Sequence, residues 1–149
     1  MSLQDDLMTA MKAAMKNKDQ MALGALRAIK SEILLAQTET GSKEEISEEQ
    51  EIKILSKLVK QRKDSATIYT EQNRSDLAEP ELAQAEVISQ FLPAQLSEAE
   101  IERVVIETIA STGAEGMKDM GKVMGIVNQK LAGQADGKTI STIVRAKLA

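Results

Sequence analysis

Positive charge gathers near the end of this 149-residue chain in a pattern that suits the binding of anions. Residues 117–149 hold 6 Lys and Arg against 2 Asp, whereas residues 1–92 hold 12 basic and 16 acidic side chains. Four of these basic residues lie beside apolar positions of helical spacing, namely Lys118, Lys122, Lys130 and Lys138. No aromatic residue lies between them, so a nucleic acid would be contacted through its backbone and shape rather than its bases. An ordinary solvated helix face is the alternative interpretation.

Two glycines share the same segment with a spacing of four residues. Gly121 and Gly125 fall inside a predicted helix, where each costs up to about 1 kcal/mol of helix propensity relative to alanine. We favour the interpretation that a neighbouring helix of the same unit approaches closely at these positions. The alternative is the close approach of a phosphate backbone or of a partner.

An arginine falls on an apolar stripe in the first half of the chain. The helical period places Arg62 on the same side as Leu55 and Val59, where a buried guanidinium would require a carboxylate. Glu81 and Glu86 on the next predicted helix are the expected partners. We interpret this set as a structural polar pair, since arginine does not titrate near neutrality and is a poor general acid or base.

The residues that are missing exclude several kinds of chemistry. The chain contains no His and no Cys, so nucleophiles of the Ser-His or Cys-His type and ordinary zinc sites are excluded. The segment Gly116–Lys122 has the spacing of a phosphate-binding loop, but it lies between predicted helices and is followed by Val123 instead of Ser or Thr. We therefore predict no catalytic residue, no metal and no cofactor.

Helical periodicity runs through the chain, and no segment alternates with a period of two. Ser2, Asp19, Ser47, Ser97 and Asp136 are placed to cap helices, and Ser47 with Gln50 has the form of a capping box. The apolar helix faces extend over residues 3–15, 22–36, 52–69, 77–92, 101–109, 120–131 and 140–148. The sequence thus predicts an all-α protein with a four-helix domain over residues 1–92 and a three-helix domain over residues 93–149.

Several separated motifs, in this order, resemble the YqeY-like, or GatB/YqeY, family. They are Lys60–Ser65, Arg74–Ala78, Phe91–Ser97, Met120–Gly125 and Ala135–Lys138. The resemblance covers nearly the whole chain. One departure is Gln84, which stands where an acidic residue is common in the family.

The resemblance implies that the C-terminal domain is similar to the tail of the B subunit of the glutamine-dependent tRNA amidotransferase. That enzyme amidates Glu-tRNA(Gln) or Asp-tRNA(Asn), and its tail helps to hold the tRNA while catalysis occurs in other domains. The family is associated with carbon–nitrogen ligase activity that uses glutamine as the amido-N-donor. No amidase-type Ser-Ser-Lys site and no credible ATP-binding segment can be recognised in this chain.

The leading hypothesis is a non-catalytic accessory protein that binds tRNA, or a tRNA-handling enzyme, through Lys118, Gly121, Lys122, Gly125, Lys130 and Lys138. A protein-interaction module without RNA binding is the alternative, and an amidotransferase in its own right is a third hypothesis. We expect no DNA and no membrane partner. Asp5 and Asp6 stand where a targeting peptide would be basic, which favours the cytoplasm.

Overall fold

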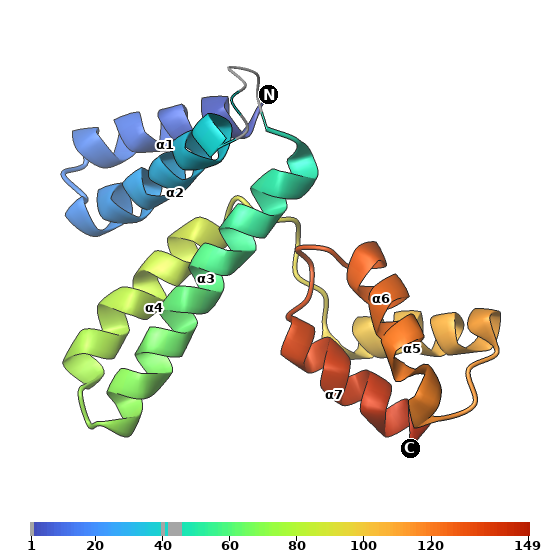
Figure 1. Ribbon diagram of the computed structural model, residues 1–149. Coiled ribbons are helices and arrows are strands. Elements are labelled where there is room, and N and C mark those ends of the chain that lie inside the picture. Colours follow the sequence, from blue (N-terminus) through green and yellow to red (C-terminus); the bar gives the residue numbers. More distant parts are fainter. Residues whose placement is uncertain (1, 40, 42–45) are drawn as a thin grey trace. The chain divides into compact units, whose positions relative to one another are not determined.

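The computed structural model describes residues 2–39, 41 and 46–149. The chain folds as two compact units, one ending at Leu92 and the other running from Pro93 to Ala149. In the described part of the chain all regular elements are helices, which confirms the all-α class (Figure 1). None of the described helices is both long enough and apolar enough to cross a membrane.

Local capping sets where the helices of the first unit begin. Helix α1 (Leu3–Lys16) starts after Ser2, α2 (Gln20–Glu39) after Asp19, and α3 (Glu48–Glu71) after Ser47. Each cap side chain accepts a backbone N–H of the first turn, and Ser47 with Gln50 forms the expected capping box. Helix α4 (Ser75–Ser89) follows a tight turn and keeps Pro80 in its second turn.

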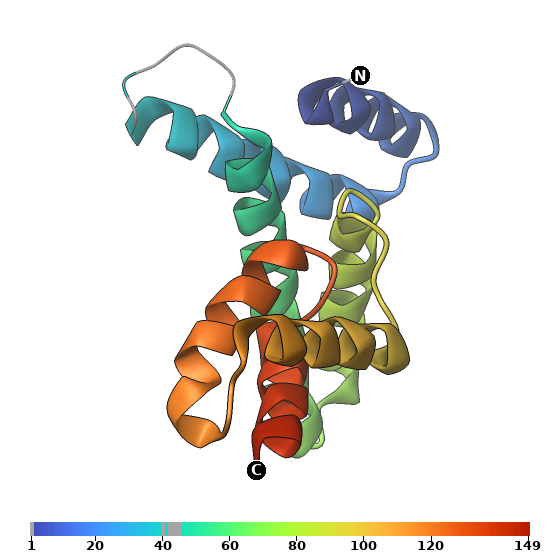
Figure 2. The same cartoon turned by 90° about the vertical axis from the view of Figure 1, so that its right-hand side faces the viewer.

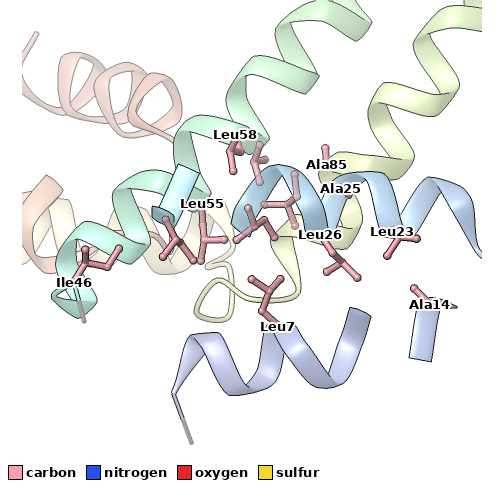
Figure 3. Close-up of a cluster of buried hydrophobic side chains, with 13 residues drawn as sticks. Leu7, Ala14, Leu23, Ala25, Leu26, Ile46, Leu55, Leu58 and Ala85 are labelled. Atoms are coloured by element: carbon pink, nitrogen blue, oxygen red, sulfur yellow. The ribbon is translucent and has the colours of Figure 1, made fainter. Parts of the chain in front are cut away.

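The first unit is held together around α2. Helices α3 and α4 form a long antiparallel hairpin, α2 packs against both of them, and α1 packs against α2 (Figures 1 and 2). The core side chains come from all four helices, and Figure 3 shows Leu7 of α1 directed towards α2. The most deeply buried large side chains of this unit are Ile29, Leu55 and Ile88.

The second unit is a three-helix arrangement with its own core. It contains α5 (Glu98–Thr112), a short 3₁₀ turn η1 (Met117–Asp119), α6 (Met120–Lys130) and α7 (Gly137–Leu148), and each of the three α-helices packs against the other two. The core is made of Ile101, Val105, Val123, Val127, Leu131, Ile140, Val144 and Leu148. Thr108 is also fully buried, and its hydroxyl donates to the carbonyl of Val104 at 2.8 Å.

The segment before α5 is tied to the loop between α6 and α7. The Leu96 N–H donates to the carbonyl of Gln134 at 2.9 Å, and Gln95 Nε2 donates to the carbonyl of Gly133 at 2.6 Å. The same loop leads into α7, where the carboxylate of Asp136 accepts the N–H of Lys138. These bonds fix the position of the first turn of α7, which contains Lys138.

Candidate nucleic-acid interface

The buried face of α6 determines which residues the helix presents to solvent. Val123 and Val127 are both 0% exposed and point into the core of residues 93–149. With 100° between successive residues, Gly125 lies on the opposite side of the helix, with Gly121 next to it. Both glycines are exposed. The outer face of α6 therefore lacks a side chain at these two positions.

The structure corrects our interpretation of these two glycines. A Cβ atom added at Gly121 or at Gly125 would meet no atom within 4 Å. Helices α5 and α7 contact other sides of α6, so helix packing gives no reason for glycine at either position. The loss of helix propensity is thus not compensated by close packing inside the described protein.

Of the four candidate lysines, only Lys118 and Lys122 lie beside this face of the helix. Lys118 lies in η1, Lys122 and Lys130 lie in α6, and Lys138 lies in the first turn of α7; all four are exposed. None of the four forms an ion pair with any residue that the structure describes. Lys118 and Lys122 lie on the flank next to Gly125, while Lys130 is further round the helix towards the core side. The resulting surface, called here the α6 face, consists of Lys118, Gly121, Lys122, Gly125, Lys130 and Lys138.

The carboxylates close to these lysines in sequence have other roles. Asp119 Oδ2 accepts the N–H of Glu115 at 3.0 Å, which closes the turn before α6. Asp136 caps α7. Lys147 Nζ pairs with Glu102 Oε1 at 2.7 Å and links α7 to α5. The pair of Lys147 with Glu102 was not predicted, since nothing in the local sequence brings the two residues together. Because Lys147 has this partner, it is not included among the unpaired lysines of the α6 face.

The structure gives Arg62 a different partner from those expected. Arg62 is only half-buried; its Nε donates to Gln84 Oε1 at 3.1 Å and its Nη1 to the carbonyl of Leu58 at 3.2 Å. Neither Glu81 nor Glu86 forms an ion pair with it in the described part of the chain. The prediction of a carboxylate partner was therefore wrong, because a partly solvated guanidinium is satisfied by a neutral amide and a carbonyl.

Gln84 also lies next to a glycine that the sequence did not single out. A Cβ atom at Gly24 of α2 would lie 3.5 Å from Gln84 Nε2. The Gln84 side chain thus lies between Gly24 on α2 and Arg62 on α3, and it links three helices. This arrangement is a packing feature and contains no reactive group.

The exposed pair at the turn between α3 and α4 has the clearest electrostatic perturbation. Arg74 Nε and Nη2 donate to Asp76 Oδ1 and Oδ2, each at 3.0 Å. The hydrogen bonds from Arg74 lower the pKa of the Asp76 carboxyl below its ordinary value. The described residues contain no group of three or more acidic side chains arranged to hold a metal ion.

Comparison of the amino-acid sequence with known proteins identifies the family of this chain. A family model described as "Yqey-like protein" matches residues 4–148. The E subunit of a glutamyl-tRNA(Gln) amidotransferase, from Thermococcus gammatolerans, is 41% identical over 73 residues, which are 46% of this chain and 12% of that archaeal protein. A protein named altered inheritance of mitochondria protein 41, mitochondrial, from Meyerozyma guilliermondii, is 34% identical over 134 residues, which are 86% of this chain and 66% of the fungal protein.

A second fungal protein of the same name, from Pyrenophora tritici-repentis, is 30% identical over 149 residues, which are 95% of this chain and 80% of that protein. This chain therefore spans a small part of the archaeal protein and most of the fungal proteins. The family model and the fungal similarity extend over nearly its whole length. The chain belongs to the Yqey-like protein family.

Proposed function

We propose that the chain is a non-catalytic accessory protein that holds tRNA by its backbone through the α6 face. The single observation that carries the proposal is that Gly121 and Gly125 open onto empty space, while four exposed lysines of the same unit have no ion-pair partner in the described structure. The similarity to a protein named for glutamyl-tRNA(Gln) amidotransferase supports tRNA as the nucleic acid. The proposal treats residues 93–149 as the binding domain and residues 1–92 as a separate helical domain.

The physical argument rests on access and charge. A helix face without side chains lets a sugar–phosphate backbone approach the helix closely, and the surrounding ammonium groups neutralise its phosphates. Each phosphate contact to RNA should then add roughly −0.7 to −0.9 to the slope of log affinity against log salt. A patch of four lysines predicts weak, salt-sensitive binding with little sequence preference. A complex that resists salt would favour the protein-interaction alternative.

The direct test is a fluorescence-anisotropy titration of deacylated tRNA at low and at physiological salt, with duplex DNA as a competitor. We expect the double variant Lys122→Glu/Lys130→Glu to lose binding. Lys12→Glu/Lys63→Glu changes the net charge equally at two exposed positions outside the α6 face and should bind like the wild type. Equal loss in both variants would show only a general charge effect, and it would contradict the assignment to the α6 face.

A second test separates binding from stability. Gly121→Ala/Gly125→Ala adds two methyl groups that meet nothing in the described structure, so it should raise the thermal midpoint through helix propensity. The same methyl groups should hinder a backbone that approaches the helix closely, so tRNA binding should weaken. We therefore expect this variant to have a higher thermal midpoint than the wild type and a lower affinity for tRNA. Unchanged tRNA affinity in this variant would remove the role assigned to the glycines.

The accessory role and the compartment are part of the same proposal. We expect the purified chain to show no glutamine-dependent amide formation on Glu-tRNA(Gln), and such activity would overturn the non-catalytic assignment. We propose the cytoplasm as its compartment. The fungal relatives carry the word mitochondrial in their names, so fractionation of cells that express the protein decides between the two compartments.

A further inference from the structure

A second surface lies in residues 2–92 and has a different chemistry. A groove of ≈ 140 Å³ runs along the seam between α1 and α2. Its floor is formed by Leu7 and Ile33, which are 3% exposed, and its walls include Met8 and Leu34, which are 57% and 51% exposed. Figure 3 shows Leu7 at this seam, directed from α1 to α2. The groove is therefore lined mainly by apolar side chains, and its polar lining residues are Gln4, Lys30 and Gln37.

The packing of α1 explains why this seam is open. The principal neighbour of α1 among the described helices is α2, whereas α2 is also covered by α3 and α4. Met8 and Met11 lie on one flank of α1, and Lys30 and Leu34, four residues apart, lie on the facing flank of α2. Two packed helices with an apolar seam form the kind of groove in which a third amphipathic helix lies. Methionine side chains adapt to the shape of such an occupant.

The charge in the groove restricts the occupant further. Lys30 is the charged residue that lines the groove, and it forms no ion pair with any described residue. Its ammonium lies one turn from the exposed Leu34, so an occupant that covers the apolar walls brings its own polar edge close to Lys30. A carboxylate at that edge would gain a partner, and a cation would be repelled.

We propose that the α1–α2 groove binds an amphipathic helix of a partner protein, with apolar residues against Met8, Met11 and Leu34 and a carboxylate against Lys30. A second copy of this chain is the competing occupant, and it would have to place a carboxylate, rather than its own Lys30, against the Lys30 of the first copy. RNA fits less well because most of the lining is apolar and only one cation lies in it. The proposal is independent of tRNA binding by the α6 face, since the two surfaces share no residue.

The test uses the full chain and a labelled helical peptide of roughly 18 residues, with leucines at positions i, i+4 and i+7 and a glutamate flanking them. We expect Lys30→Glu to weaken binding of this peptide by about fivefold. A peptide with lysine in place of the glutamate should bind the Lys30→Glu protein better than it binds the wild type. Lys63→Glu, an equal charge change on α3 outside the groove, should leave the affinity for both peptides unchanged.

The apolar walls are tested separately. Met8→Gln and Leu34→Gln change side chains that are more than half exposed, so both variants should fold, and each should weaken the peptide complex by about tenfold. The proposal is overturned if the wild type does not bind the peptide, if the charge exchange has no effect, or if the wild type self-associates through this groove. Anisotropy with tRNA on the same variants should be unchanged, which distinguishes failure of this proposal from failure of the α6 face.

Discussion

Helices α2 and α6 both contain glycine, but the glycines have opposite surroundings. An added Cβ at Gly24 of α2 would lie 3.5 Å from Gln84 Nε2, whereas Gly121 and Gly125 of α6 face empty space. At Gly24 the added atom would make an ordinary van der Waals contact with a neighbouring helix. At the two positions in α6 it would meet nothing inside the described structure. A glycine in a helix is therefore not by itself a sign of close helix packing.

Ion pairs occur in both units and involve only a minority of the described basic residues. In the first unit Lys60 pairs with Asp64 and Arg74 with Asp76, and in the second Lys147 pairs with Glu102. Lys30 and Lys63 of the first unit, like the lysines of the α6 face, have no ion-pair partner among the described residues. Exposed pairs contribute little to stability, so these ion pairs matter little for folding. Three predictions test the differences between the two units.

The largest effect should come from deleting matched core side chains. Ile29→Ala in α2 and Ile140→Ala in α7 each remove a side chain that is 0% or 1% exposed, and each should lower the free energy of unfolding by about 2–5 kcal/mol. If the two units open separately, Ile29→Ala should reduce amide hydrogen-exchange protection in α1–α4 and spare α5–α7, and Ile140→Ala should do the reverse. Loss of protection throughout the chain in both variants would show that the units unfold together.

A smaller effect should distinguish the two kinds of glycine. The Cβ of Gly24→Leu would already contact Gln84, so the rest of the leucine side chain should displace that residue and lower the free energy of unfolding by about 1–3 kcal/mol through overpacking. The Cβ of Gly125→Leu would meet no neighbour in the described structure, and this variant should raise the free energy of unfolding by up to about 1 kcal/mol through helix propensity. Urea denaturation followed by circular dichroism measures both. A destabilised Gly125→Leu protein would mean that the outer side of α6 is covered by protein after all.

The features that depended on local sequence were predicted well. Ser2, Asp19, Ser47, Ser97 and Asp136 all cap the helices that follow them, because a cap and its first turn lie within three residues of each other. The register between helices was not predictable in this way. The partner of Arg62 depends on how α3 lies along α4, and the pair of Lys147 with Glu102 depends on how α7 meets α5.

The candidate site shows the same division between local and tertiary information. Its residue types and their helical spacing were visible in the sequence, and the structure shows the lysines exposed. Which side of α6 is buried depends on Val123 and Val127, and the sequence pattern suggested this correctly. What occupies the opposite side is a property of the tertiary fold, so our prediction that a helix packs against Gly121 and Gly125 was wrong. The groove beside Lys30 was missed because a seam between two helices leaves no motif in either.

The smallest effect concerns the pair at the turn between α3 and α4. Because Arg74 lowers the pKa of Asp76 in the folded protein, the pair contributes to stability above the ordinary pKa of 3.8, and this contribution is lost as the pH falls through the lower folded value. Arg74→Gln should therefore lower the urea midpoint slightly near neutral pH, and the difference from wild type should disappear once the pH has fallen below the lowered pKa of Asp76. Lys63→Gln removes the same charge at a position without an ion-pair partner in the described chain and is the matched control. A difference for Arg74→Gln that persists at low pH would mean that Arg74 acts through the turn itself. In that case the ion pair between Arg74 and Asp76 would contribute nothing measurable to the stability of this hairpin.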